Sequence, residues 1–102
     1  MSTLHTVNKS PFERSNLDSC LGHAVAGDAV LLMEDAVIAA VKGTTVAGRI
    51  GDAAKDLKVY VLGADLQARG LDPANVVDGV TVADYATFVD LAAGSKTVNA
   101  WL

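Results

Sequence analysis

The sequence predicts an α/β fold in one domain spanning residues 1–102, with a largely parallel sheet flanked by helices. Segments with strand and helix character alternate along the chain, which is the order that a parallel sheet requires. The continuous apolar run AVLLM at residues 29–33 is typical of a strand covered on both faces, and KVYVL at Lys58–Leu62 reads as a second buried strand. No linker or repeat divides the chain, and one core of this size is sufficient for a domain.

The first half of the chain supplies two strands and two helices. Thr3–Val7 is short and β-branched, and we expect it to form the first strand. From Leu17 onward, apolar residues recur at i, i+3, i+4 and i+7, which predicts an amphipathic helix that ends near Gly27. After the apolar run at 29–33, an alanine-rich segment predicts a short helix that stops at Gly43.

The second half is less regular. Residues 48–57 are compatible with a helix, and residues 63–69 predict a helical turn after the second buried strand. Residues 76–80 predict a weak strand, and we expect Thr81 to begin a further helix. The terminal segment 97–102 carries a tryptophan and no polar tail, which indicates a docked strand or an interface element.

Charge and hydropathy limit the classes of function. The formal net charge is −4, and the eight lysines and arginines are scattered, so direct nucleic-acid binding is not expected. No apolar stretch approaches the roughly 20 residues that span a bilayer, and the N-terminus does not resemble a signal peptide. We therefore expect a cytoplasmic protein without membrane contact. The hydrophobic content of 51% predicts a buried subunit interface.

Cys20 is the candidate nucleophile, because it is the single cysteine. An ordinary thiol with a pKa of about 8.5 is only roughly 3% thiolate at pH 7, so its reactivity depends on its surroundings. His23 follows three residues later on the same predicted helix and is a weaker candidate for a catalytic base. Two structural interpretations stay open: Cys20 as a small core residue, and His23 as a cation that interacts with the helix dipole.

No metal site or cofactor is expected. One cysteine and two histidines without a CxxC pair do not make a zinc site, and no nucleotide-binding loop, GxSxG or HExxH motif occurs. His5 lies within the first predicted strand, facing either an interface or a satisfied buried position. Glu34 and Asp35 follow a central strand, where paired acids are more often capping groups than a general acid and base.

Several blocks of the sequence together carry a resemblance to one known family. The first block, LHTVNKSPFE at residues 4–13, is similar to the opening of the DsrH/TusB family of sulfur-relay subunits, in which a short strand runs into a Lys-or-Arg-Ser-Pro loop. The blocks LLMEDAVIAAVKGT, KVYVLGADLQARGL, DYATFVDL and NAWL then follow in the order of the family. The resemblance covers nearly the whole chain and implies a compact DsrEFH-like domain with a five-stranded sheet.

The resemblance also implies a subunit of a sulfurtransferase complex and not an autonomous enzyme. The expected partners are two small subunits of the DsrE/TusD and DsrF/TusC types, in a heterohexamer that passes persulfide sulfur to a DsrC/TusE-type carrier. The principal persulfide cysteine then belongs to the DsrE/TusD-type partner, and Cys20 is a candidate persulfide or carrier-docking residue.

A cysteine at the position of Cys20 is typical of the DsrH branch, which favours a role in sulfur oxidation. The alternatives are a TusB-type subunit in 2-thiolation of the tRNA wobble uridine, and a structural subunit whose cysteine is not catalytic.

Overall fold

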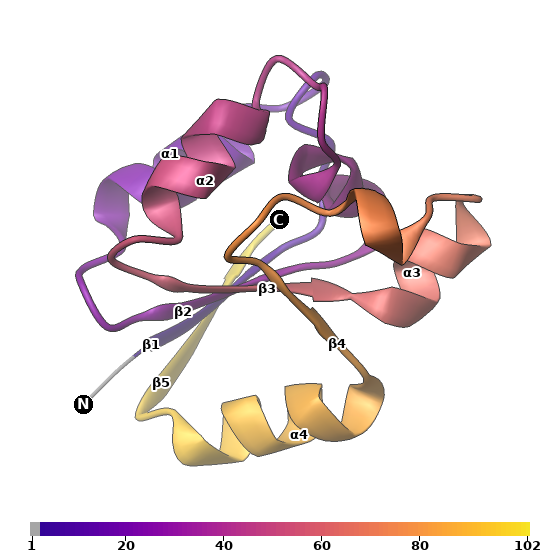
Figure 1. Ribbon diagram of the computed structural model, residues 1–102. Coiled ribbons are helices and arrows are strands. Elements are labelled where there is room, and N and C mark those ends of the chain that lie inside the picture. The colour runs from indigo at the N-terminus through magenta and orange to yellow at the C-terminus, as the bar shows by residue number, and fades with distance from the viewer. Residues whose placement is uncertain (1–2) are drawn as a thin grey trace.

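The computed structural model describes residues 3–102 and contains a five-stranded sheet in which every strand runs parallel to its neighbours (Figure 1). The order of strands across the sheet is β4-β3-β2-β1-β5. Their bounds are β1 Thr3–Val7, β2 Ala29–Leu32, β3 Lys58–Leu62, β4 Thr81–Ala83 and β5 Thr97–Trp101. The predicted fold class is therefore confirmed, and the sheet is entirely parallel.

Helical segments connect successive strands. Their bounds are α1 Asn16–His23, the 3₁₀ segment η1 Glu34–Ala40, α2 Ala47–Ala53, α3 Gly63–Ala68, the 3₁₀ segment η2 Pro73–Asn75 and α4 Tyr85–Gly94. In Figure 1, α1 and α2 lie on one side of the sheet and α4 lies alone on the other. No helix among residues 3–102 is long and apolar enough to cross a membrane.

Two apolar cores follow from this layering. The larger core lies between the sheet and the side that carries α1, η1 and α2, and it includes Leu17, Cys20, Val37 and Ile50. The smaller core lies under α4, where Leu4, Leu31 and Leu62 of the sheet meet partly buried side chains of that helix. All four residues of β2 are buried, as the uninterrupted apolar run predicts for a central strand.

The expected boundaries of two elements were wrong. Helix α1 ends at His23, because Ala24 is already extended and the backbone N–H of Val25 donates to the Asp28 carboxylate. Gly27, where we expected the helix to end, lies in the following turn with a φ of +92°. The alanine-rich segment is helical, as expected, but it forms a 3₁₀ helix over Glu34–Ala40 that ends before Gly43.

The region around β4 also differs from the sequence-based expectation. Residues 76–80 do not form a strand; within them Val76 makes only an isolated antiparallel bridge to Val41. Thr81 belongs to β4, which pairs with β3, and not to a helix. Helix α4 begins at Tyr85 because the Asp84 side chain accepts a hydrogen bond from the backbone N–H of Thr87.

Strand β5 lies beside β1, although these strands are at opposite ends of the chain. The register places Trp101 opposite Val7, and Asn99 opposite His5. Because side chains alternate between the faces of a strand, Trp101 and His5 are on the same face and diagonally adjacent. The last strand therefore brings the single tryptophan into contact with the first strand, on the α1 side of the sheet.

Candidate functional site

Cys20 lies on the inner side of α1 with none of its surface exposed, within the larger core. Burial raises the pKa of its thiol to about 12, and the nearby negative charge of Asp28 adds to the rise. At pH 7 the fraction of thiolate is then on the order of 10⁻⁵, against roughly 3% for an ordinary thiol. These observations weigh against Cys20 as a nucleophile in the isolated chain.

His23 is on the exposed side of α1 and does not hydrogen-bond to Cys20 within the described part of the chain. Its Nδ1 atom lies 2.8 Å from the backbone carbonyl oxygen of Ser19, so Nδ1 carries a proton and donates it. The imidazole ring also stands 5.4 Å from the Trp101 ring, measured between centroids. The structure therefore places His23 against the last strand and not against the thiol.

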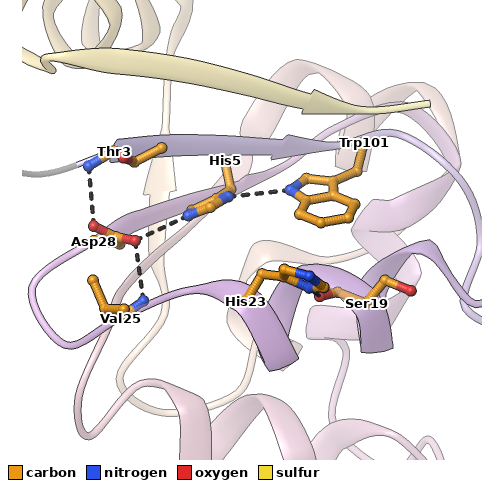
Figure 2. Close-up of polar contacts among 7 residues, drawn as sticks. All are labelled: Thr3, His5, Ser19, His23, Val25, Asp28 and Trp101. Carbon is orange, nitrogen blue, oxygen red and sulfur yellow. Dashed lines mark hydrogen bonds and ion pairs between the residues drawn. The ribbon is translucent and has the colours of Figure 1, made fainter.

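A buried polar cluster lies between α1, β1 and β5, and Figure 2 shows its members. His5 and Asp28 are each only 4% exposed, and His5 Nε2 lies 3.0 Å from Asp28 Oδ2. The same carboxylate accepts hydrogen bonds from the backbone N–H groups of Thr3, at 3.0 Å, and Val25, at 3.1 Å. Asp28 therefore joins the start of β1 to the turn that precedes β2.

Trp101 completes this cluster from the last strand. Its Nε1 atom donates to His5 Nδ1 at 3.1 Å (Figure 2). An indole N–H can only donate, so His5 Nδ1 must be the acceptor, and the proton of the neutral imidazole resides on Nε2. That proton points to Asp28, which gives an ordered chain of hydrogen bonds from indole to imidazole to carboxylate.

Asp28 is the charged group of this cluster. The hydrogen bond from the Thr3 backbone N–H is the main cause that lowers the pKa of the Asp28 carboxyl, with further lowering from His5 and Val25, although burial opposes it. Asp28 is therefore an ionised carboxylate at neutral pH. Its three donors compensate most of the cost of burying a charge.

The cluster resembles the histidine and carboxylate of a catalytic triad but lacks the free acceptor that such chemistry needs. A general base must have a lone pair facing the group that it deprotonates. In this protein the only acceptor nitrogen of His5 is already bonded to Trp101. The arrangement is suited to fastening the two terminal strands and not to proton abstraction.

Two acidic residues, Glu34 and Asp35, follow β2 at the carboxyl edge of the sheet, and each makes a structural contact through its backbone or its side chain. The Asp35 carboxylate pairs with the Arg69 guanidinium at 2.9 Å. The backbone N–H of Glu34 donates to the Asp65 carboxylate at 2.6 Å, which holds Glu34 at its unusual positive φ of 49°. The Asp35 carboxylate is therefore committed to an ion pair, whereas Glu34 is fixed through its backbone.

Two members of the buried cluster were not identified as a site from the sequence. Asp28 reads as part of a Gly-Asp turn, and nothing in its immediate neighbours shows that it becomes buried. Trp101 was expected to dock, and the structure shows its hydrogen-bond partner. The available signal was the combination of an indole near the end of the chain with a histidine inside a strand, since buried polar groups require partners.

Comparisons with known proteins agree with the fold and define the family. The model of the family described as DsrH like protein matches residues 9–98. Protein TusB of Erwinia tasmaniensis is 41% identical over 98 residues, which cover 96% of this chain and 99% of that protein. Protein TusB of Escherichia coli is 35% identical with the same coverage. The chain belongs to the DsrH/TusB family.

Solved structures of more distant proteins share the fold. The ychN protein of Escherichia coli superposes with a TM-score of 0.81 at 18% identity, covering 98% of this chain and 99% of that chain. A protein of unknown function from Methanobacterium thermoautotrophicum gives a TM-score of 0.69 at 14% identity, with 96% of both chains covered. At this level of identity the likeness concerns architecture alone.

Proposed function

We propose that this chain is the TusB-type subunit of a sulfur-relay complex that supplies sulfur for 2-thiolation of the tRNA wobble uridine. The observation that carries the proposal is the set of relatives named Protein TusB, which are 35–41% identical over almost their full length. The expectation of a role in sulfur oxidation depended on Cys20, whereas the curated relatives described above are named Protein TusB. The comparisons favour the alternative, tRNA thiolation.

The partners in this proposal are two related small subunits of the DsrE/TusD and DsrF/TusC types and a DsrC/TusE-type carrier. The DsrE/TusD-type partner holds the cysteine that bears the persulfide. This chain contributes a rigid subunit surface, which its high hydrophobic content supports.

Cys20 is, in this proposal, a structural residue of the core. Its complete burial and the pKa of about 12 support that role, because a persulfide is formed and passed on by an accessible thiolate. The competing prediction is that Cys20 carries sulfur. It requires α1 to move away from the sheet in the assembled complex, so that the thiol reaches a partner.

The test is complementation in Escherichia coli that lacks its own TusB and the two partner subunits. This chain is expressed together with its own two partners, and 2-thiouridine in total tRNA is measured by mass spectrometry. We expect thiolation to be restored by wild type and by Cys20→Ala, and to be absent when this chain is omitted. Failure of the complete, co-purifying complex to restore thiolation contradicts the proposed function.

The role of Cys20 has a separate measurement. After the purified complex is incubated with a persulfide donor, intact mass spectrometry of this chain shows whether it gains one sulfur atom. A gain that Cys20→Ser abolishes overturns the structural role and establishes Cys20 as a member of the relay. If only the partner gains sulfur, the structural role stands.

A further inference from the structure

Strand β5 is anchored by a single side chain. Within residues 3–102 it lies at the edge of the sheet and pairs only with β1. The side chains from Thr97 to Ala100 are all exposed, whereas that of Trp101 is partly buried and packs against the larger core. Backbone pairing holds one side of an edge strand and leaves the other side free. The indole of Trp101 is therefore the side-chain contact that fixes the end of β5.

The hydrogen bond that holds this indole exists in only one protonation state of His5. Trp101 Nε1–H donates to His5 Nδ1 at 3.1 Å, and the other ring nitrogen of His5 donates to Asp28 (Figure 2). An imidazolium carries a proton on both nitrogens and has no acceptor. An indole N–H has no lone pair to offer either, so protonation of His5 leaves two donors facing each other. A charged His5 ring and a docked indole therefore exclude each other.

The groups around His5 decide whether its ring can hold a charge. Asp28 is ionised because hydrogen bonds, first that of the Thr3 backbone N–H, lower the pKa of its carboxyl. No lysine or arginine among residues 3–102 pairs with this carboxylate, so its charge favours an imidazolium. Cys20 on α1 stays neutral, because burial raises the pKa of its thiol to about 12. Burial of the His5 ring opposes the charge until water enters as the indole leaves.

His23 on α1 is the other titratable group beside the indole. Its ring centroid lies 5.4 Å from that of Trp101, and its Nδ1 atom is already bonded to the Ser19 carbonyl oxygen, so a second proton goes to Nε2. A cation at this distance from an indole ring is attracted to it. Protonation of His23 therefore holds Trp101 in place, whereas protonation of His5 removes the acceptor. Because the two effects have opposite signs, substitution of each histidine separates them.

We propose that Trp101 and His5 form a pH-sensitive latch on the terminal strand. When His5 takes a proton from the solvent on Nδ1, the indole hydrogen bond breaks and the Trp101 side chain leaves the core. Water then accepts the hydrogen bond from Nδ1, and the end of β5 separates from β1. Loss of the proton restores the acceptor, and the indole docks again. The latch depends on contacts within this chain and is independent of the proposed function.

The latch is tested by nuclear magnetic resonance on the full chain labelled with nitrogen-15. Trp101 is the only tryptophan, so a single indole N–H signal reports its contact. The protection factor of this N–H against exchange with water is measured from about pH 8 to about pH 4.5, a range in which an ordinary imidazole gains its proton and Asp28 stays ionised. We expect the protection factor to fall about tenfold or more, while the backbone amides of β2 keep theirs.

Two substitutions identify the histidine that is responsible. In His23→Gln the other imidazole is absent, and the fall in protection is expected to remain. His5→Asn offers the indole an amide oxygen that does not titrate, so protection is expected to be independent of pH. Circular dichroism verifies that each variant is folded. If His5→Asn does not fold, the nitrogen-15 shifts of the His5 ring in His23→Gln replace it, because protonation of the ring and loss of indole protection must then occur at the same pH.

Three results overturn the inference. An indole N–H that stays protected over the whole range shows that acid does not release Trp101. A fall in protection that persists in His5→Asn, or that disappears in His23→Gln, assigns the release to a group other than His5. An equal loss of protection in β2 at the same pH shows that the whole domain unfolds and that no local release of β5 takes place.

Discussion

Replacing Trp101 with phenylalanine is expected to lower the free energy of unfolding by about 1–3 kcal/mol, because it leaves a buried acceptor without a partner. Within residues 3–102, the Trp101 indole supplies the one hydrogen bond to His5 Nδ1. The His5 side chain is only 5% exposed, so water does not easily replace the indole. A loss of this size is a large share of the roughly 5–15 kcal/mol that stabilises a typical domain.

The assay is urea unfolding followed by far-ultraviolet circular dichroism, since Trp101 is the only tryptophan and its fluorescence is lost with the substitution. The matched control is Tyr85→Phe, which also alters an aromatic side chain, but one that is 57% exposed. We expect the control to change stability by less than about 0.5 kcal/mol. A double-mutant cycle with His5→Leu separates the hydrogen bond from the loss of packing.

The tautomer of His5 gives an independent check of the same reasoning. Nitrogen-15 chemical shifts distinguish the protonated nitrogen of an imidazole from the unprotonated one, and with only two histidines His23→Gln completes the assignment. We expect the proton on Nε2. A proton on Nδ1, or a Trp101→Phe variant as stable as wild type, refutes the hydrogen-bond chain.

Three further predictions concern the neighbouring charges and the thiol. Asp28→Asn is expected to lower the free energy of unfolding by about 1–3 kcal/mol at pH 7. Because folding lowers the pKa of Asp28, its contribution to the free energy of unfolding is present above roughly pH 4 and is lost as the pH falls further. Between pH 7 and pH 2, the urea midpoint of Asp28→Asn should therefore fall less steeply than that of the wild type. The free energy of unfolding of the wild type should fall by up to about 1.4 kcal/mol per pH unit from roughly pH 9 up to a pH of about 12, because the Cys20 thiol ionises in the unfolded chain before it does so in the folded one. In urea titrations at alkaline pH, Cys20→Ala should lack this part of the decrease. Arg49→Ala, which removes an exposed ion pair to Asp18, should shift the urea-derived stability by less than about 0.5 kcal/mol.

The sequence predicted best the strands that are buried along most of their length. β2 is apolar throughout, and β3 is apolar after the exposed Lys58, because both faces of these central strands are covered, and such runs are visible without a structure. The start of α4 was misplaced because Thr81 and Val82 fit a helical pattern as well as a strand. Thr81 is in a strand because it pairs with Tyr60 of β3, and this contact is not local in sequence.

The candidate site divides in the same way. Cys20 and His23 were identified from their types and spacing, but spacing on one helix does not show which side chain faces the core. Cys20 packs inward and is buried, whereas His23 points outward to Trp101. Burial, which decides whether a thiol ionises, is a property of the packed helix and not of the helix alone.

The pattern of residues alone was sufficient for the α/β class, for the family and for three of the five strands, and it left residues 97–102 open between a docked strand and an interface element. The meeting of His5, Asp28 and Trp101 is a result of the topology, because after β4 the chain passes along α4 to the opposite edge of the sheet, where β5 pairs with β1. The hydrogen bond between Trp101 and His5 joins residues 96 positions apart. Local propensity contains no information about such a pair, because each polar group needs the other as a partner only once the fold has buried both of them.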